Sequence, residues 1–405
     1  MSGMTLAEAK QAVRDELDKR RDEILELNHA IHADPEISWE EHRAAARISD
    51  YLRRAGFDVE LGVYGCDTAF EASIGDGDLT VTLCSEYDAL PAIGHGCGHN
   101  VIATVGVGAA VALAPLVKEA GLRLKLLGTP AEEHGGGKCT MLREGAWEDS
   151  DFSMMVHGMT GQDTSAAMKI YTAVDRFKVT LHGLGAHAAA APWNGLSATS
   201  AAALSLNAIA FLRQHMVPGV NMNAYIEESG HATNIIAERA VVQVEVRALE
   251  VDTWRDVKKR VLKCFEGAAI ATGCTWEWEA TENAYAPVDP DKMLAGLWDD
   301  NLRALGREPI EFSGLGGGST DMGNVTQVLP AIHPMIAFLG EDAVPHTRDF
   351  TAAAITPAAD KATIDGATAL AFTTLDVALN QELRMHYQTL KAARPAGATQ
   401  ISLEA

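Results

Sequence analysis

Cysteine and basic residues are both scarce in this chain of 405 residues. The six cysteines are widely separated and show no short regular spacing, which argues against the disulfide framework of a small secreted protein. Lys and Arg together number 33 against 55 Asp and Glu, so the net charge is −22. Such an acidic surface repels phosphate groups, and we therefore expect neither nucleic acid nor an anionic membrane as a partner.

A signal peptide and a long hydrophobic run are also lacking. The N-terminus, MSGMTLAEAKQAVRDELDKRRDE, is charged and helical in pattern, without the basic start, apolar stretch and cleavage site of a secretory leader. The apolar run Val101–Val117 contains Gly and Pro and is too short to span a bilayer comfortably, so it predicts a buried helix. These features together predict a cytoplasmic protein in a reducing environment.

Helices and strands alternate along the first part of the chain. The first thirty residues have the pattern of one amphipathic helix, and a second is expected between Ser38 and Gly56. Its start, Ser38-Trp39-Glu40-Glu41, fits a capping box, in which the Ser caps the helix amides and a Glu reaches back. The β-rich runs LTVTLCSEYDAL, LRLKLLGTP and SMMVHG follow, separated by helical segments. This alternation predicts an α/β domain with a mainly parallel sheet.

A second domain is expected within the first, since 405 residues exceed what one hydrophobic core usually serves. After Tyr171 the pattern becomes strand, helix, two strands, helix, strand, which predicts an inserted α+β domain of the split βαβ, ferredoxin-like type. After Pro287 a helix, a Gly-rich loop and a buried strand resume. We therefore expect a catalytic domain of residues 1–172 and 287–392, an inserted domain of 173–286 and a loose tail of 393–405.

A metal-binding pattern stands at residues 95–100, His-Gly-Cys-Gly-His-Asn. Cys97 and His99 place a thiolate and an imidazole two residues apart, and both are good ligands for a borderline ion such as zinc. Taken alone, the pattern also fits a buried Cys beside a hydrogen-bonded His.

A pair of adjacent carboxylates, Glu132 and Glu133, follows the apolar strand LKLLGT. In such a place one carboxylate can bind a metal while its neighbour takes a proton from water, although a charged turn is the alternative. His157 ends another apolar strand, and His187 and His346 occur later in the chain. Metal ligands often come from the loops at the ends of different strands of one sheet, so these residues are candidates for a shared site.

Several segments occur in one order from residue 86 to 347 and cover both expected domains. They are EYDALPAIGHGCGHN, GTPAEEHGGGK, MMVHG, GAHAAAAPWNG, HATNIIAERA, GGGSTDMGNV, and VLPAIHP followed by PHT. In this combination the chain resembles the amidohydrolase branch of the aminoacylase and carboxypeptidase family of two-metal peptidases. That branch includes hippurate hydrolases, auxin-conjugate hydrolases and aminobenzoyl-glutamate hydrolases.

The resemblance implies a metal-dependent enzyme that cleaves the amide bond of an N-acyl or aryl-acyl amino acid or a dipeptide. It implies two divalent ions, zinc or manganese with cobalt as a further candidate, and Glu132 as the general base for the attacking water. Asp88 matches a site-supporting acid. The implied metal ligands are Cys97, His99, Glu133, His157 and His346.

The resemblance also assigns roles to the inserted domain, as a lid and dimerisation domain. His187 matches a His that reaches the active site of the partner subunit and stabilises the oxyanion, so a homodimer or higher homo-oligomer is implied. Asn234 and Arg247 match residues that hold a substrate carbonyl or carboxylate. The loop at residues 316–320, Gly-Gly-Gly-Ser-Thr, lacks the Gly-Lys-Ser/Thr ending of a phosphate-binding loop. We therefore expect the backbone of Gly317 and Gly318 to line the substrate pocket.

One departure from the commoner pattern is Asn100, where many members of the branch have Asp, so a neutral amide replaces a charge beside the expected metals. Three alternatives stay open: dipeptidase specificity on the same fold, a thiol hydrolase with Cys97 as nucleophile, and a metal-binding scaffold without activity. The retained Glu132 argues against the scaffold. Two residues of separation on one loop give poor geometry for a Cys97–His99 nucleophile and base.

Overall fold

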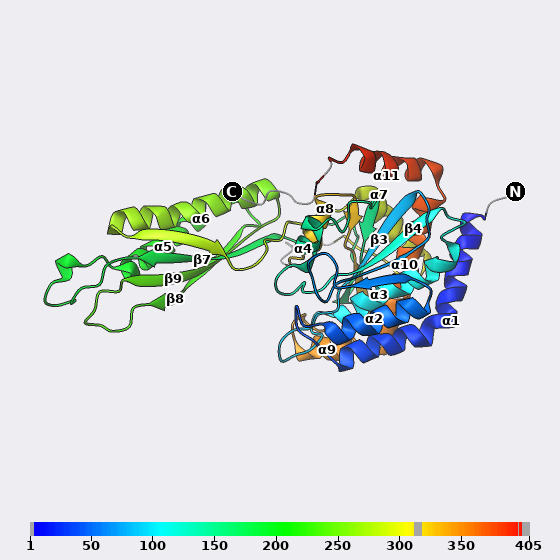
Figure 1. Cartoon of the computed structure of the whole chain (residues 1–405), viewed down its shortest axis with the longest axis horizontal. Coiled ribbons are helices and arrows are strands. Elements are labelled where there is room, and N and C mark those ends of the chain that lie inside the picture. Colours follow the sequence, from blue (N-terminus) through cyan, green and yellow to red (C-terminus); the bar gives the residue numbers. More distant parts are fainter. Residues whose placement is uncertain (1–3, 312–317, 396, 399–405) are drawn as a thin grey trace. The chain divides into compact units, whose positions relative to one another are not determined.

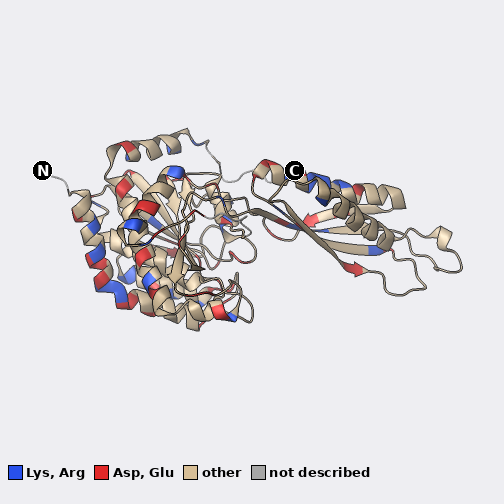
Figure 2. Cartoon of the chain, turned by 180° about the vertical axis from the view of Figure 1, so that it is seen from behind, with Lys and Arg blue, Asp and Glu red and all other residues tan. Residues whose placement is uncertain are grey.

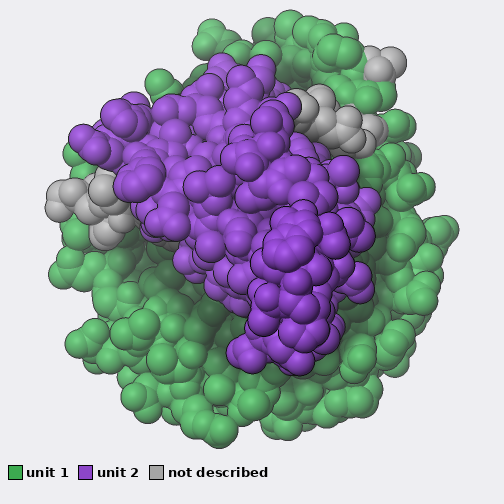
Figure 3. All heavy atoms as spheres, turned by 90° about the vertical axis from the view of Figure 1, so that its left-hand side faces the viewer, with its two compact units in different colours: residues 1–169, 288–314, 324–401 green, residues 170–287, 315–323, 402–405 purple. Residues whose placement is uncertain are grey.

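The computed structural model describes residues 4–311, 318–395, 397 and 398 (Figure 1). Gly317 and most of the expected tail lie outside these residues. The described residues form two compact units, coloured separately in Figure 3. Unit 1 holds residues 4–169, 288–311, 324–395 and 397–398, and unit 2 holds 170–287 and 318–323.

Unit 1 contains a six-stranded mixed sheet in the order β1-β2-β4-β3-β5-β11 and a two-stranded sheet of β12 and β6. Its strands are β1 (Asp58–Leu61), β2 (Phe70–Ile74), β3 (Leu79–Ser85), β4 (Leu122–Gly128), β5 (Phe152–Met154), β6 (His157–Gly161), β11 (Ala331–Ile332) and β12 (Met335–Leu339). Its helices are α1 (Leu6–Ala33), α2 (His42–Arg54), α3 (His99–Leu113), α4 (Gly137–Arg143), α7 (Lys292–Ala304), α9 (Arg348–Ala353), α10 (Pro357–Ala378) and α11 (Gln381–Ala393). A short 3₁₀ turn follows α3 at Ala114–Leu116, and α8 (Met322–Thr326) crosses the boundary between the units.

Parallel pairing in the larger sheet is confined to β4, β3, β5 and β11, so the sheet is mixed rather than mainly parallel. The strands β1 and β2 pair antiparallel with each other, and β2 pairs antiparallel with β4. Only residues 62–69 connect β1 to β2, and so short a connection cannot contain the crossover that parallel strands require. Between β3 and β4, by contrast, the chain crosses over through α3.

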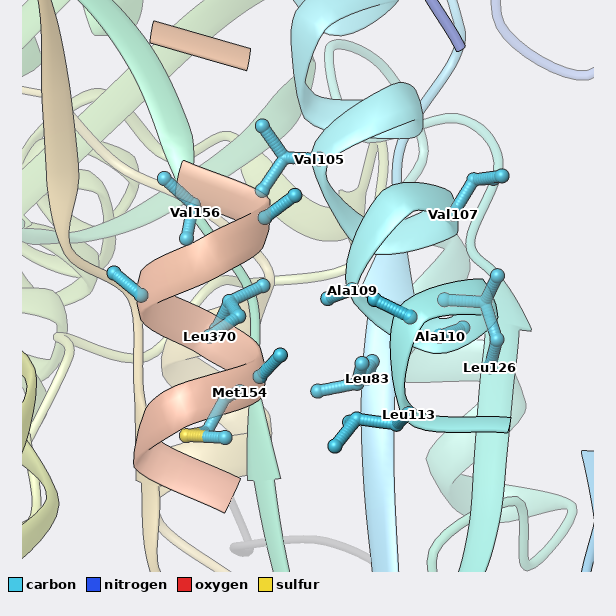
Figure 4. Close-up of a cluster of buried hydrophobic side chains, with 14 of the residues drawn as sticks. Leu83, Val105, Val107, Ala109, Ala110, Leu113, Leu126, Met154, Val156 and Leu370 are labelled. Carbon is cyan, nitrogen blue, oxygen red and sulfur yellow. The ribbon is translucent and has the colours of Figure 1, made fainter. Parts of the chain in front are cut away.

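The core of unit 1 is built around α3, in which every residue is buried. The helix packs against α1, α10 and β3, and its small and β-branched side chains allow close approach on all sides. Figure 4 shows Val105, Ala109 and Leu113 of α3 beside Leu83 of β3 and Leu370 of α10. The stretch His99–Leu116 is apolar enough to be a candidate membrane span, yet 89% of it is buried inside the protein, as in a core helix.

The N-terminal helix covers this core with one face. Its buried residues Val13, Leu17 and Ile24 recur at helical spacing, and the charged positions between them are visible in Figure 2 next to the N-terminus. A capping box does start this helix: the Thr5 hydroxyl accepts from the Glu8 amide while the Glu8 carboxylate accepts from the Thr5 amide.

Unit 2 has the element order β7-α5-β8-β9-α6-β10, and its four strands form an antiparallel sheet in the order β10-β7-β9-β8. The elements are β7 (Ala173–His182), α5 (Ala198–Leu212), β8 (Asn221–Ser229), β9 (Arg239–Ala248), α6 (Val251–Thr272) and β10 (Thr275–Ala280), with 3₁₀ turns at Pro192–Asn194 and Arg213–His215. Their apolar faces form a core of their own, centred on Phe177, Trp254 and Phe265.

The division between the units differs from the expected boundaries at residues 318–323, which group with unit 2. Gly318 accepts a hydrogen bond from the Thr172 amide at 2.8 Å, and the Ser319 hydroxyl contacts Thr172 at 3.0 Å. These contacts attach the end of the Gly-rich loop to the start of β7, a connection that the sequence does not reveal.

Candidate active site

The strand ends of unit 1 bring the candidate residues together. The parallel strands β3 and β4 stop at the same level, since Ser85 pairs with Gly128. Asp88 follows the first strand, Glu132 and Glu133 follow the second, and His157 follows β5. Because carboxyl ends of parallel strands meet at one edge of a sheet, all of these side chains lie in one region.

Cys97 and His99 enter the same region from the N-terminus of α3. Gly98 stands between them with φ of 77°, in the left-handed region that favours glycine. A Cβ atom there would also approach Phe350 Cε1 to 3.3 Å. The glycine between the two candidate ligands is therefore required by the backbone.

Two sets of ligand atoms share the thiol of Cys97. In the first set, ligand atoms of Cys97, His99 and His157 lie within 4.8 Å of one another; in the second, those of Cys97, Glu133 and His346 do. Cys97 Sγ is 3.5 Å from His157 Nε2, and His346 Nε2 is 3.6 Å from Glu133 Oε2. The two sets together contain all five expected ligands, and these residues could hold divalent cations.

The histidine tautomers leave the correct nitrogen free for a cation. His157 Nδ1 lies 2.7 Å from the Gly158 carbonyl, which only accepts, so the proton is on Nδ1 and Nε2 faces Cys97. His99 Nδ1 lies 2.9 Å from Asp88 Oδ1, which likewise directs Nε2 into the site. Within the described residues, His99 Nε2 and Glu133 Oε1 are buried without a hydrogen-bond partner, as expected of atoms whose partner is a metal.

The charge of the site is unbalanced in favour of cations. His99 Nε2 has carboxylate oxygens of Glu86, Glu132 and Glu133 at 3.6, 3.8 and 3.8 Å. Burial alone would lower the pKa of His99, but the negative charge of Asp88 and its hydrogen bond raise that pKa well above its ordinary value. The carboxylates of Glu86, Asp88, Glu132 and Glu133 concentrate negative charge around His99, which divalent cations would neutralise.

Burial is the largest cause of the pKa shifts of Cys97 and His157. It raises the pKa of the Cys97 thiol, and the charge of Glu133 raises it further. It lowers the pKa of His157 to about 4, so this imidazole is neutral and able to ligate.

Asp88 supports the site without joining either ligand set. Its Oδ1 holds His99, and its Oδ2 accepts from the Ser38 hydroxyl at 2.8 Å and from the Glu133 amide at 3.0 Å. Burial would raise the pKa of this carboxyl, but His99 and these hydrogen bonds lower it overall, so it stays ionised. Asp88 thereby fixes the orientation of one ligand and the backbone of another.

Glu132 is placed as a group that acts beside the metals. It is 7% exposed and lies within ligand distance of His99 and Glu86, but it belongs to neither of the two sets that share Cys97. The residue before it, Ala131, has φ of 58°, and His346 has φ of 65°. Left-handed backbone at non-glycine residues is costly, and its presence twice in this site indicates that tertiary contacts hold it there.

Ser38 and Glu41 form no capping box, contrary to the sequence pattern. Helix α2 begins at His42 and its N-terminus has no side-chain cap, because Ser38 donates to Asp88. The Glu41 carboxylate instead accepts from the amides of Trp39 and Ala131. Ser38 and Glu41 therefore form hydrogen bonds with Asp88 and Ala131, which are distant in sequence, instead of capping the helix.

Asn100 does not face the metal ligands. Its side-chain amide donates to Asn28 Oδ1 at 2.6 Å and to the Ala354 carbonyl at 3.0 Å, so it joins α3 to α1 and to the end of α9. The amide of Asn100 therefore supports the packing of α3 rather than contacting the candidate ligands. One helical step from His99 turns the side chain by about 100°, away from the site.

Sequence reasoning missed a buried ion pair at the back of the site. Lys138 donates to Glu86, and both side chains are completely buried. In the sequence, the only indication that Glu86 lies at the site is its position directly after the buried strand β3. The ring of His333 lies 5.5 Å from that of His157, between their centroids.

The remaining candidates belong to unit 2 and fall into two groups. His187 forms an antiparallel bridge with Ile235, and the Asn234 carbonyl accepts from the Ala188 amide at 2.9 Å, so the segments that carry His187 and Asn234 lie side by side. Arg247 on β9 contacts Glu245 at 2.8 Å and the Ser319 hydroxyl at 3.0 Å, next to Gly318. Gly317 lies outside the described residues.

Comparisons with known proteins show the family of the chain. Residues 83–362 match the model of peptidase family M20/M25/M40. The chain is 37% identical over 386 residues to the Xaa-Arg dipeptidase of Mus musculus, covering 91% of this chain and 88% of the relative. It is 31% identical over 294 residues to one of the subunits of p-aminobenzoyl-glutamate hydrolase from Escherichia coli, covering 67% and 60%.

Solved structures share the fold at low sequence identity. A putative aminohydrolase from methicillin-resistant Staphylococcus aureus superimposes with a TM-score of 0.78 at 20% identity, covering 91% of this chain and 99% of the other. A dinuclear metal-binding peptidase from Bacillus subtilis gives 0.71 at 18% identity, covering 89% and 99%.

Proposed function

The chain belongs to peptidase family M20/M25/M40 and is a hydrolase of amide or peptide bonds, and we propose that its substrates are dipeptides and N-acyl amino acids. The observation that supports this most directly is the pair of ligand sets sharing the Cys97 thiol, with Glu132 beside them. We assign the two cations to five residues: Cys97, His99, Glu133, His157 and His346. The thiolate favours zinc, and manganese and cobalt are the alternatives.

When bound, the two cations would polarise the substrate carbonyl and lower the pKa of the attacking water. Glu132 accepts a proton from that water at its carboxylate and returns it to the nitrogen of the leaving amine. Asp88 keeps the proton of His99 on Nδ1, so that Nε2 stays directed into the site. The buried position of Glu132 excludes bulk water from the proton transfer.

We assign stabilisation of the oxyanion to His187. Its Nδ1 accepts from the amides of Ala189 and Ala190 at 3.2 and 3.1 Å, which leaves the proton on Nε2 of an exposed ring. A fixed Nε2–H donor is what an oxygen that becomes negative requires. Arg247, held by Glu245 and Ser319, is assigned to the free carboxylate of the substrate.

Unit 2 also supports a homodimer, with this unit as lid and dimerisation domain. Strand β8 is at the edge of the antiparallel sheet and offers unpaired backbone groups. On α5, Leu204 and Phe211 are seven residues apart on one helix face and are 42% and 74% exposed. Apolar side chains so exposed beside a sheet edge favour association with a second copy.

Complementation tests both the dimer and the action of His187 in the partner's site. We expect the variants His187→Ala and Glu132→Gln to be inactive when expressed separately, and their co-expression to restore about a quarter of wild-type activity. Half of the dimers are then mixed, and each mixed dimer has one complete site. Activity no greater than that of the separate variants would show that His187 does not act across the dimer.

Among substrates, we propose a preference for dipeptides with a basic C-terminal residue. The net charge of −22 attracts cationic substrates, and the Xaa-Arg dipeptidase matches the chain over most of its length. With zinc or manganese added, kcat/KM for an Ala-Arg dipeptide should exceed that for hippurate and for p-aminobenzoyl-glutamate by about tenfold or more. Preference for either acyl substrate would overturn this choice, and inactivity on the whole panel would contradict the proposed substrate classes.

A further inference from the structure

The segment between α1 and α2 contacts the two loops that carry Asp88 and Glu132. Trp39 has φ of 71°, and its indole ring fills the space that a side chain at Gly135 would need. Ser38 holds Asp88. Two consecutive residues of this segment thus contact the loop after β3 and the loop after β4.

Glu41 provides the contact closest to the general base. Its side chain is completely buried, and its Oε1 accepts from the amides of Trp39 and Ala131, both at 2.9 Å. Its other oxygen, Oε2, accepts from the Thr68 hydroxyl at 2.8 Å. Three segments distant in sequence therefore converge on one carboxylate.

The Ala131 amide held by Glu41 begins the loop that carries Glu132. Ala131 has the left-handed φ of 58°, and its carbonyl accepts from the Gly136 and Gly137 amides at 3.0 and 3.3 Å. An alanine avoids this conformation unless its surroundings impose it. Relaxation to an ordinary φ would turn the following residue and move its carboxylate.

We propose that Glu41 is a positioning residue for Glu132: its carboxylate holds the Ala131 peptide in the left-handed conformation that directs Glu132 toward the reacting water. This inference rests on the proposed role of Glu132 as general base. A displacement of about 1 Å at a reacting group can cost on the order of 100-fold in rate, so the contact matters to kcat without touching substrate.

Glu36 offers a matched control in the same segment. It too is a buried glutamate, 7% exposed, and its carboxylate accepts two backbone amides at 2.8 Å. Those amides belong to Arg43 and Ala44 in the first turn of α2, remote from the loop of Glu132. A general need for buried acids in this segment would affect both glutamates alike.

The first test measures kcat, KM, metal content and thermal midpoint for Glu41→Ala, Glu41→Gln and Glu36→Gln. We expect Glu41→Ala to lower kcat by about 30- to 100-fold, with KM changed by less than about threefold and both metals retained. Glu41→Gln should stay within about fivefold, because its amide oxygen still accepts from Ala131. Glu36→Gln should leave kcat unchanged. Normal kcat in Glu41→Ala, or loss of metal in step with kcat, would overturn the proposal.

The second test repeats the change in an Ala131→Gly background. Glycine adopts positive φ at little cost, so Glu41→Ala should then lower kcat by only about threefold. An equal loss in both backgrounds would show that Glu41 does not act through the conformation of Ala131. Should Glu41→Ala fail to fold, Glu41→Met, which keeps most of the side-chain volume but has no oxygen to accept from Ala131, gives the same comparison in the two backgrounds. If Glu132→Gln were as active as the wild type, the proposed general base would fail instead, whatever Glu41 does.

Discussion

Glu132→Gln should lower kcat by about 1,000-fold or more while both metal ions stay bound. Glutamine has nearly the same shape as glutamate but cannot accept a proton, and general base catalysis typically contributes about 100- to 10,000-fold. Glu132 belongs to neither ligand set that shares Cys97, so its replacement leaves those sets intact. The measurements are kcat on an active dipeptide and metal content by mass spectrometry.

The adjacent carboxylate provides the control for this prediction. Glu133→Gln alters a member of the second ligand set and should lower the metal content toward one ion per chain. Glu132→Gln would then lose turnover but keep metal, whereas Glu133→Gln would lose metal. If Glu132→Gln kept more than about a tenth of the wild-type kcat, another group would have to be the base.

Cys97→Ser should remove both metals and abolish activity. The Cys97 thiol belongs to both ligand sets, and serine, whose hydroxyl does not ionise at neutral pH, replaces a thiolate with a poor ligand. We expect the metal content to fall below about half an ion per chain and activity below about 1%. Once the cations are lost, the negative charge of the carboxylates around His99 is no longer balanced by them.

Cys264→Ser in α6 is the matched control, since Cys264 is a half-buried thiol of unit 2 whose pKa burial also raises. It should retain metal and activity. The metal measurement also separates the hydrolase with two cations from a thiol hydrolase. An inactive Cys97→Ser protein that still bound two ions would indicate that the thiol is the nucleophile rather than a ligand.

The candidate metal ligands could be chosen from the sequence because several of them follow the ends of strands. Glu133 and His157 each follow a buried strand, and parallel strands bring their carboxyl ends to one edge. The Cys-Gly-His spacing and the resemblance supplied the rest. The six cysteines all lie within the described residues and form no disulfide there.

The supporting contacts could not be predicted, because they depend on tertiary partners. The pattern at Ser38 and Glu41 fits a capping box, but Asp88 and the Ala131 amide compete for the same groups and are preferred in the fold. Asn100 stands next to a ligand in sequence, yet the phase of α3 turns it toward Asn28. Pairing of Glu86 with Lys138 joins residues 52 positions apart, and no local pattern reports it.

Metal removal and reconstitution test the central claim, that two cations on the Cys97 site perform the hydrolysis. The protein is treated with a chelator, dialysed, and titrated with zinc or manganese while hydrolysis of an active dipeptide is followed. We expect less than about 1% of the activity without metal and full recovery at about two metal ions per chain. Full activity in protein holding less than about a tenth of an ion per chain would contradict it.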